Sequence, residues 1–302
     1  MNVANLETAS IGWPITRLGV SFFPVYLSAN NVPEIETGAA AELVVDELDK
    51  PSVQALHVRN PDDKPLLIVE GEHILGGKQN RAINVTILVP PKAILEIPVS
   101  CLERGRWGER RASRRDEAFA PVRVRAAKEV GVTRSMLRSG SRDGDQTAVW
   151  REIDEMLSRA SVQSPTASAA DMRRAAHRTE SSRAATIEKL AARGPLPGQC
   201  GIVFVHGYWV TAMDVFGSPR LLAAHWAALI RSHLLESPVT NGSPSATRAL
   251  QIVRRFAWAH AKEAPGIGLG VEHRVVDDRL TGHALTLDKA LVHAAFFTEI
   301  PQ

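Results

Sequence analysis

The chain has 302 residues, enough for one large domain or two ordinary ones. Its composition, 44% apolar and 23% charged with a net charge of +3, is that of a globular protein and excludes a disordered or collagen-like chain. The apolar runs are far shorter than the ~18 residues of a membrane helix, and no basic-then-apolar leader pattern opens the sequence. Two cysteines, Cys101 and Cys200, cannot form a disulfide framework, so we expect a cytoplasmic protein without a membrane segment.

The first part of the chain, residues 1–108, is predicted to be rich in β-structure. Residues 66–69 form a short apolar run typical of a buried strand, and residues 81–89 and 93–101 alternate between apolar and polar side chains. Gly76-Gly77 is predicted to be a two-residue hairpin turn, because glycine tolerates positive φ at both positions. We expect an antiparallel β-sandwich or barrel-like sheet in this N-terminal portion.

The central part, residues 109–198, is predicted to be a basic, mainly helical arm. Helices are expected over residues 118–137 and 147–160, and Asp143 with Gln146 resembles a capping box before the second helix.

Positive charge is concentrated between Arg104 and Arg142. This segment has 12 basic and 4 acidic residues, whereas the rest of the chain has 24 basic and 29 acidic residues. Such a block either docks nucleic acid or an acidic partner, or is a solvated arm. The solvated arm is favoured, because arginine is the usual cation of this chain and only Trp107 and Phe119 place aromatic rings among these arginines.

The last part, residues 199–302, is predicted to be an α+β portion. A helix is expected to start at Ser218-Pro219, a cap followed by a proline in the first turn, and another helix is expected over residues 245–261. Strands are expected at residues 201–205, 271–287 (two strands around a turn at Asp277-Asp278) and 291–297. The chain as a whole is therefore predicted to be α+β, and its three portions can pack as one family-level domain.

The densest group of polar residues lies between Glu70 and Trp107. A two-residue turn at Gly76-Gly77 would place Glu72 opposite Arg81, and a turn at residues 90–92 would place Arg81 opposite Cys101. These registers bring a set of unlike polar side chains to one end of a sheet: Glu72, Lys78, Gln79, Asn80, Arg81, Cys101 and Glu103.

This mixture suits a polar ligand that carries phosphate. Arginine grips phosphate with parallel hydrogen bonds and lysine adds a point charge, so Lys78 and Arg81 are predicted to hold phosphate. Glu72 or Glu103 is predicted to act as a general base or to accept from a ligand hydroxyl. The remaining residues predicted to bind the ligand are Gln79 and Asn80, which would orient it, Arg106, and Trp107, which could stack on a base. The alternative is a salt-bridged strand end, in which the two glutamates only neutralise the two cations.

Other chemistries receive less support from the sequence. A strand would point His73 away from Glu70 and Glu72, so no metal site is predicted there, although a hard divalent ion at Glu72 and Glu103 stays an alternative. Cys101 is either a nucleophile activated by its cationic neighbours or a buried inert thiol, and its apolar strand face favours the inert thiol. No Gly-x-Ser-x-Gly elbow follows the strand that ends near His206, which argues against an α/β-hydrolase.

Two longer motifs carry a family resemblance. The string Lys78-Gln79-Asn80-Arg81 and the run from Pro98 to Trp107 resemble the ARG and rhodanese-phosphatase-superfamily-associated protein domain family, in which ARG stands for ADP-ribosylglycohydrolase. The resemblance covers residues 16–297, although an aspartate is expected more often where Glu70 stands and residues 158–193 match no motif.

The resemblance implies a substrate class more than a reaction. The family name implies an association with enzymes that remove ADP-ribose and with phosphatase-like domains. We therefore expect a protein that binds or processes ADP-ribose, NAD or a related phosphorylated nucleotide, with no cofactor or oligomeric state assigned. The alternative function is a non-catalytic interaction module that docks nucleic acid or an acidic partner through the Arg-rich arm.

Overall fold

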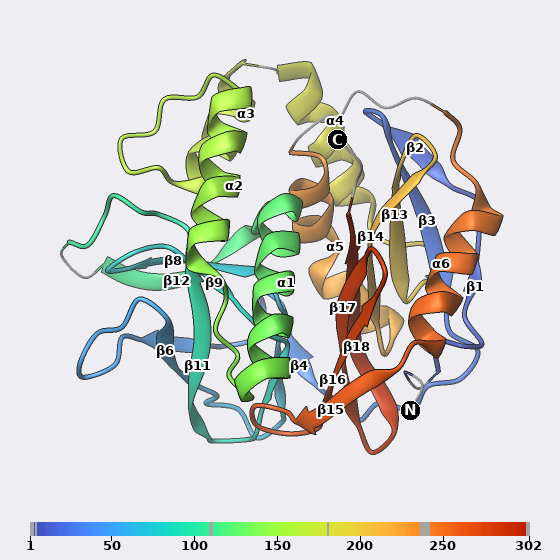
Figure 1. Cartoon of the computed structure of the whole chain (residues 1–302), viewed down its shortest axis with the longest axis horizontal. Coiled ribbons are helices and arrows are strands. Elements are labelled where there is room, and N and C mark those ends of the chain that lie inside the picture. The colour runs from blue at the N-terminus through green and yellow to red at the C-terminus, as the bar shows by residue number, and fades with distance from the viewer. Residues whose placement is uncertain (1–2, 4, 109–110, 180, 236–241, 300–302) are drawn as a thin grey trace. The chain divides into compact units, whose positions relative to one another are not determined.

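The structure is a computed structural model that describes residue 3 and residues 5–108, 111–179, 181–235 and 242–299, without the side chains of residues 176–181. Helices and strands are both abundant, which confirms the predicted α+β class (Figure 1). The chain forms two compact units. Unit 1 consists of Met1–Glu34, Arg193–Trp226 and Glu236–Gln302, and unit 2 consists of Ile35–Ala192 and Ala227–Leu235. The three portions inferred from the sequence stay a prediction.

Unit 1 is built on one antiparallel sheet whose strand order is β1-β3-β13-β14-β18-β17-β16-β15, with β2 paired to β3. Its strands are β1 (Ser10–Ile11), β2 (Ile15–Arg17), β3 (Val20–Tyr26), β13 (Gly201–His206), β14 (Trp209–Phe216), β15 (Ala261–Pro265), β16 (Val271–Asp277), β17 (Leu280–Leu287) and β18 (Ala290–Thr298). The strands expected near the C-terminus are all present. The pairing of β3 with β13, which joins segments far apart in the sequence, was not predicted.

Helix α6 (Ala246–Trp258) covers one face of this sheet. Its N-cap is Ser245, whose side-chain hydroxyl accepts a hydrogen bond from the Arg248 backbone N–H. Its apolar stripe enters the core of unit 1, where the rings of Phe256 and Phe296 are 5.4 Å apart. Helix α5 (Pro219–His233) starts at the predicted Ser218-Pro219 boundary, and its residues are divided between the two units after Trp226.

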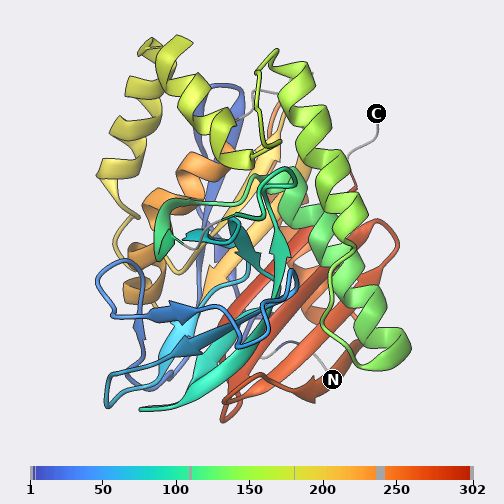
Figure 2. The ribbon, with the colours of Figure 1, turned by 90° about the vertical axis from the view of Figure 1, so that its left-hand side faces the viewer.

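Unit 2 contains a six-stranded sheet with the order β12-β8-β9-β11-β6-β5 and a three-stranded sheet with the order β10-β7-β4. The strands are β4 (Glu36–Thr37), β5 (Val44–Asp46), β6 (Ala55–Arg59), β7 (Leu66–Ile68), β8 (Glu72–Gly77), β9 (Arg81–Ile83), β10 (Ile87–Val89), β11 (Ile94–Cys101) and β12 (Arg111–Phe119). The blue and teal strands of the larger sheet can be followed in Figure 2. All pairs in unit 2 are antiparallel except β4 with β7.

Unit 2 also contains helices α1 (Val122–Ser139), α2 (Gln146–Arg159), α3 (Ala169–Thr179) and, up to Ala192, α4 (Ser181–Arg193). Val149, Ile153 and Met156 of α2 are fully buried and pack with Val124 of α1 in one core. The cap of α2 is Asp145, which accepts from the Ala148 backbone N–H at 3.0 Å, so the predicted role of Asp143 is wrong. No helix of the described chain is long and apolar enough to cross a membrane.

The strand registers decide which polar residues meet. Arg81 lies opposite Cys101, as predicted, but it also lies opposite Ile74 and not opposite Glu72. The predicted register of this hairpin is wrong by two residues. Gly76 and Gly77 are the last residues of strand β8, and the chain turns after them.

Two element predictions are also corrected. The predicted strand over residues 81–89 is divided into β9 and β10, and β10 pairs with β7. The predicted helix over residues 118–137 starts only at Val122, because residues before it belong to strand β12.

Candidate ligand-binding site

The polar residues singled out in the sequence, with the exception of Glu72, gather where β9 and β11 pair in unit 2. Arg81 begins β9 and lies opposite Cys101, the last residue of β11. The ring of Trp107 lies over two cations, with Lys78 Nζ 5.3 Å and Arg81 Cζ 5.8 Å from the ring centroid. Both distances are within reach of a cation–π interaction. We call the group formed by Glu47, Lys78, Arg81, Glu103, Arg106 and Trp107 the Arg81 cluster.

Glu103 is held by donors on both carboxylate oxygens. Arg106 Nε lies 2.8 Å from Oε2, the Asn80 backbone N–H donates to the same oxygen at 3.3 Å, and Thr166 Oγ1 donates to Oε1 at 2.9 Å. The residue is 7% exposed. This arrangement supports Glu103 as a positioning residue that fixes the segment leading to Trp107, and its role as a general base stays a prediction.

Arg106 ties the same segment to the end of strand β8. Its Nη1 donates to the Gly77 carbonyl at 3.1 Å, and its Nη2 donates to the Gly76 carbonyl at 3.2 Å and to Asn80 Oδ1 at 3.3 Å. The Gly76 backbone N–H also donates to Asn80 Oδ1, at 3.1 Å. Arg106 and Asn80, both predicted to touch a ligand, therefore tie the segment that carries Trp107 to the end of β8.

Gln79 and Cys101 lie beside the backbone of Glu103. Gln79 Nε2 donates to the Glu103 carbonyl at 3.0 Å, while its buried Oε1 has no hydrogen-bond partner among the described residues. Cys101 is fully buried, and this burial raises the pKa of its thiol. A neutral, buried thiol is a poor nucleophile, which supports the inert reading of Cys101.

Arg81 is the least satisfied charge of the cluster. Its side chain is fully buried, and its one hydrogen bond among the described residues is a long one, from Nη2 to the Ser52 carbonyl at 3.5 Å. Within the described part of the chain, Nε and Nη1 have no acceptor. Burial lowers the pKa of the guanidinium. The Cys101 thiol is itself neutral, so Glu47 and Glu103 are the counter-charges that oppose this effect at neutral pH.

Glu47, which sequence reasoning missed, reaches the cluster from the end of strand β5. Its Oε1 accepts from the Lys78 backbone N–H at 2.7 Å, and the residue is 9% exposed. Glu47 follows a strand that is distant in sequence from Lys78, so no local motif identifies it as a member of the cluster.

Glu72 contacts a different set of residues. Its Oε1 accepts from the Val69 backbone N–H at 2.8 Å, and its Oε2 lies 3.0 Å from Arg115 Nε. Burial raises the pKa of Glu72, and the charge of Arg115 opposes this shift. The structure thus gives Glu72 partners outside the Arg81 cluster, and its predicted role as a base stays untested.

His73, on the other side of the same strand, lies against Asp116. His73 Nδ1 is 3.0 Å from Asp116 Oδ2, and Arg173 places Nη1 and Nη2 each 2.7 Å from one carboxylate oxygen. The Asp116 side chain is 1% exposed. Burial alone would raise the pKa of Asp116, but the hydrogen bonds and charges of His73 and Arg173 outweigh it and hold the pKa well below its ordinary value.

A further ionic group, formed by Glu70 with Arg125 and Lys128 of helix α1, is fully buried. Glu70 Oε2 accepts from Arg125 Nη2 at 2.9 Å and Nε at 3.2 Å, and Glu70 Oε1 lies 2.6 Å from Lys128 Nζ. Lys128 Nζ also donates to the Asn84 carbonyl at 2.9 Å. All three charged side chains are 0% exposed, so this group is a structural centre of unit 2.

Several arginines of the basic block between Arg104 and Arg142 form ion pairs within unit 2. Arg104 lies 2.9 Å from Asp154, in addition to the pairs of Arg106, Arg115 and Arg125 already described. Arg111 and Arg114 are exposed on strand β12, and Glu109 and Arg110 lie outside the described residues. Docking of nucleic acid or of an acidic partner by the arm stays a prediction.

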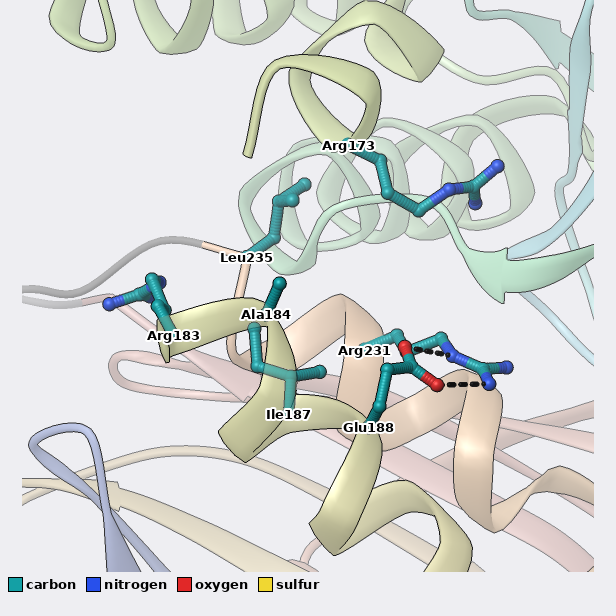
Figure 3. A pocket seen from close by; sticks show the side chains of 7 residues that line it. All are labelled: Arg173, Arg183, Ala184, Ile187, Glu188, Arg231 and Leu235. Carbon is teal, nitrogen blue, oxygen red and sulfur yellow. Dashed lines mark hydrogen bonds and ion pairs between the residues drawn. The ribbon is translucent and has the colours of Figure 1, made fainter. Parts of the chain in front are cut away.

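A small pocket lies between helices α4 and α5 in unit 2. Figure 3 shows Arg231 paired with Glu188, and Arg173 and Arg183 extending away from one another. The two hydrogen bonds from Arg231 Nε and Nη2 to Glu188 are 2.9 and 2.7 Å long. The cavity measures about 20 Å³. That space holds about one water molecule, so this pocket is too small for a nucleotide.

Over the residues that the structure describes, no group of three or more histidine, cysteine, aspartate or glutamate side chains could hold a metal ion.

The fold and the Arg81 cluster together define an α+β protein with a buried, partly unsatisfied cationic cluster. The chain belongs to the ARPP-1 family, described as the ARG and rhodanese-phosphatase-superfamily-associated protein domain, whose model matches residues 8–297. No curated protein and no solved structure matches the chain.

Replacing Glu103 by glutamine should test its positioning role. Because the change removes a charged acceptor shared by Arg106 and the Asn80 backbone, we expect a loss of about 1–3 kcal/mol in the free energy of unfolding. Urea unfolding measures this loss, and Glu96→Gln on the exposed part of β11 is the matched control. A variant as stable as the unaltered protein would contradict the positioning role.

Proposed function

We propose that this protein binds a small phosphorylated nucleotide, of the ADP-ribose or NAD type, at the Arg81 cluster. The observation that carries the proposal is the fully buried guanidinium of Arg81, whose Nε and Nη1 lack acceptors among the described residues. A buried charge without hydrogen bonds is costly, so such a group is retained where something else supplies the acceptors. Phosphate oxygens are acceptors that arginine binds especially well.

The other members of the cluster fit the same ligand. Lys78, Arg81 and Arg106 carry three positive charges against the two negative charges of Glu47 and Glu103, so an anion is favoured. Trp107 is 48% exposed, which leaves ring surface on which a base can stack. Because Arg81 is fully buried, a ligand reaches it only after a neighbouring side chain moves, and Trp107, which is half-exposed with its ring centroid 5.8 Å from Arg81 Cζ, is one such neighbour.

The family supports the ligand class only through its name, which associates it with ADP-ribosylglycohydrolases and with rhodanese-phosphatase enzymes. The proposal is therefore one of binding, and it includes no reaction.

The test combines ligand titration with a variant that separates binding from folding. Replacing Arg81 by methionine removes the unsatisfied charge and keeps an unbranched side chain that matches the arginine as far as its Nε. Because two guanidinium nitrogens of Arg81 are buried without acceptors among the described residues, the substitution removes an uncompensated cost, and we expect the melting temperature to be maintained or raised. The affinity for ADP-ribose, measured by calorimetry, should fall by about 30-fold or more, because charged hydrogen bonds to phosphate are lost.

Arg104→Met is the matched control, since Arg104 lies close in sequence and pairs with Asp154 at the surface. The control should bind ADP-ribose as the unaltered protein does. If the unaltered protein binds neither ADP-ribose nor NAD nor pyrophosphate, or if Arg81→Met binds them as tightly, the proposed function is wrong.

A further inference from the structure

Glu47 is a second buried group of the Arg81 cluster with unused hydrogen-bonding capacity. Its Oε1 accepts from the Lys78 backbone N–H at 2.7 Å, whereas its Oε2 is buried and has no hydrogen-bond partner in the described part of the molecule. An ionised carboxylate oxygen that is buried without a donor is costly, as is a guanidinium without an acceptor.

The carboxylate is held in place by its surroundings. Oε1 is fixed by the Lys78 backbone, and a Cβ atom at Gly77 would lie only 2.7 Å from this oxygen. Gly77 also has a φ of +53°, a backbone conformation that favours glycine. The chain thus makes room for the Glu47 carboxylate at the end of β8, next to the loop that carries Lys78.

The unused acceptor and the unused donors are linked through Lys78, because Glu47 accepts from the Lys78 backbone N–H while Lys78 Nζ and Arg81 Cζ lie over the same ring of Trp107. A bare phosphate would satisfy Arg81, but it would be repelled by Glu47 and would leave Oε2 without a donor. A ligand that carries a hydroxyl beside its phosphate would satisfy both groups at once.

We propose that Glu47 accepts a hydrogen bond from a sugar hydroxyl of the ligand and thereby selects phosphorylated sugars over inorganic phosphate or pyrophosphate. This inference rests on the proposed function and adds a specificity residue to it. The competing arrangement is a direct ion pair between Glu47 and Arg81, which would serve the fold and would not distinguish between ligands.

The experiment compares two ligands on one variant. Glu47→Gln keeps an oxygen that can accept from the Lys78 backbone and removes the charge. We expect its affinity for ADP-ribose, measured by calorimetry, to fall by about 10-fold, because a hydrogen bond to a charged acceptor becomes one to a neutral acceptor. Its affinity for pyrophosphate should stay the same or rise, since a repulsive charge has been removed. The matched control is Asp46→Asn, an equal charge change at the neighbouring exposed residue of β5, which should leave the ratio of the two affinities unchanged.

The unaltered protein provides a second readout that needs no variant. Ribose 5-phosphate should bind at least about 10-fold more tightly than inorganic phosphate, by the same hydrogen-bond argument. If Glu47→Gln weakens ADP-ribose and pyrophosphate equally, or ribose 5-phosphate and phosphate bind alike, Glu47 is not a specificity residue even though the site binds phosphate. If no phosphorylated ligand binds the unaltered protein, the proposed function itself fails, and this inference fails with it.

Discussion

Replacing Glu70 by glutamine is expected to lower the free energy of unfolding by about 3–5 kcal/mol, the usual cost of breaking a buried ion pair. Glu70 is the carboxylate shared by Arg125 and Lys128, and all three side chains are fully buried. Burial lowers the pKa of Lys128, and the charge of Glu70 is the largest effect that opposes this shift. Without that charge, two cations stay in the interior with too little compensation.

Urea unfolding monitored by circular dichroism checks this prediction. The matched control is Glu155→Gln on helix α2, where the carboxylate is 49% exposed and lies 3.3 Å from Arg159 one turn away. Exposed pairs of this kind contribute about 0.3–0.5 kcal/mol, so the control should be almost neutral. Equal losses for the two variants would show that the buried position of Glu70 has no special importance.

Local patterns predicted much of the fold of each unit. Strand β11 follows from its alternation of apolar and polar residues, and helix α5 from Ser218-Pro219, because both signals depend on neighbours in the sequence. Strand β12 has no such signal, since Arg111–Phe119 is mostly charged and polar. Its extended conformation is instead explained by pairing with β8, which no local pattern reveals.

The glycines at the end of β8 show the same limit. The sequence predicted positive φ at Gly76 and Gly77, and φ is +102° and +53° at these positions. A glycine is required at position 76 because of a neighbouring strand and not because of a turn. A Cβ atom there would lie 2.1 Å from the Ala112 carbonyl oxygen of β12. The glycine at position 76, which resembled a hairpin-turn signal in the sequence, is therefore explained by the close approach of strand β12.

For the candidate site, sequence reasoning depended on the register. The pairing of Arg81 with Cys101 was predicted correctly, and it brings Lys78, Arg81 and Trp107 together. A two-residue error in the other hairpin leaves Glu72 on the same face but moves it by ~6.6 Å along the strand. Glu47 could not be found, because it reaches the cluster from a strand at the far edge of the sheet order.

Replacing Asp116 by asparagine is expected to reduce stability at neutral pH and to flatten its dependence on pH in acid. The Asp116 carboxylate lies between His73 and Arg173, and its pKa in the folded protein is held well below the ordinary value of 3.8. Below that ordinary value the unfolded chain takes up a proton that the folded protein does not. The contribution of Asp116 is therefore complete above about pH 4 and is lost as the pH falls from there.

We expect Asp116→Asn to cost about 3 kcal/mol near pH 7, because a buried acceptor of two charged hydrogen bonds loses its charge. The difference between the variant and the unaltered protein should then shrink steadily below about pH 4, as the native carboxylate loses its advantage over the unfolded one. Urea unfolding at a series of pH values measures both effects. Asp277→Asn is the control, since Asp277 pairs with Arg255 at the surface of unit 1 and should contribute less than about 1 kcal/mol at any pH. A stability difference for Asp116→Asn that is the same near pH 7 and near pH 2 would refute the link to ionisation and leave only a packing effect.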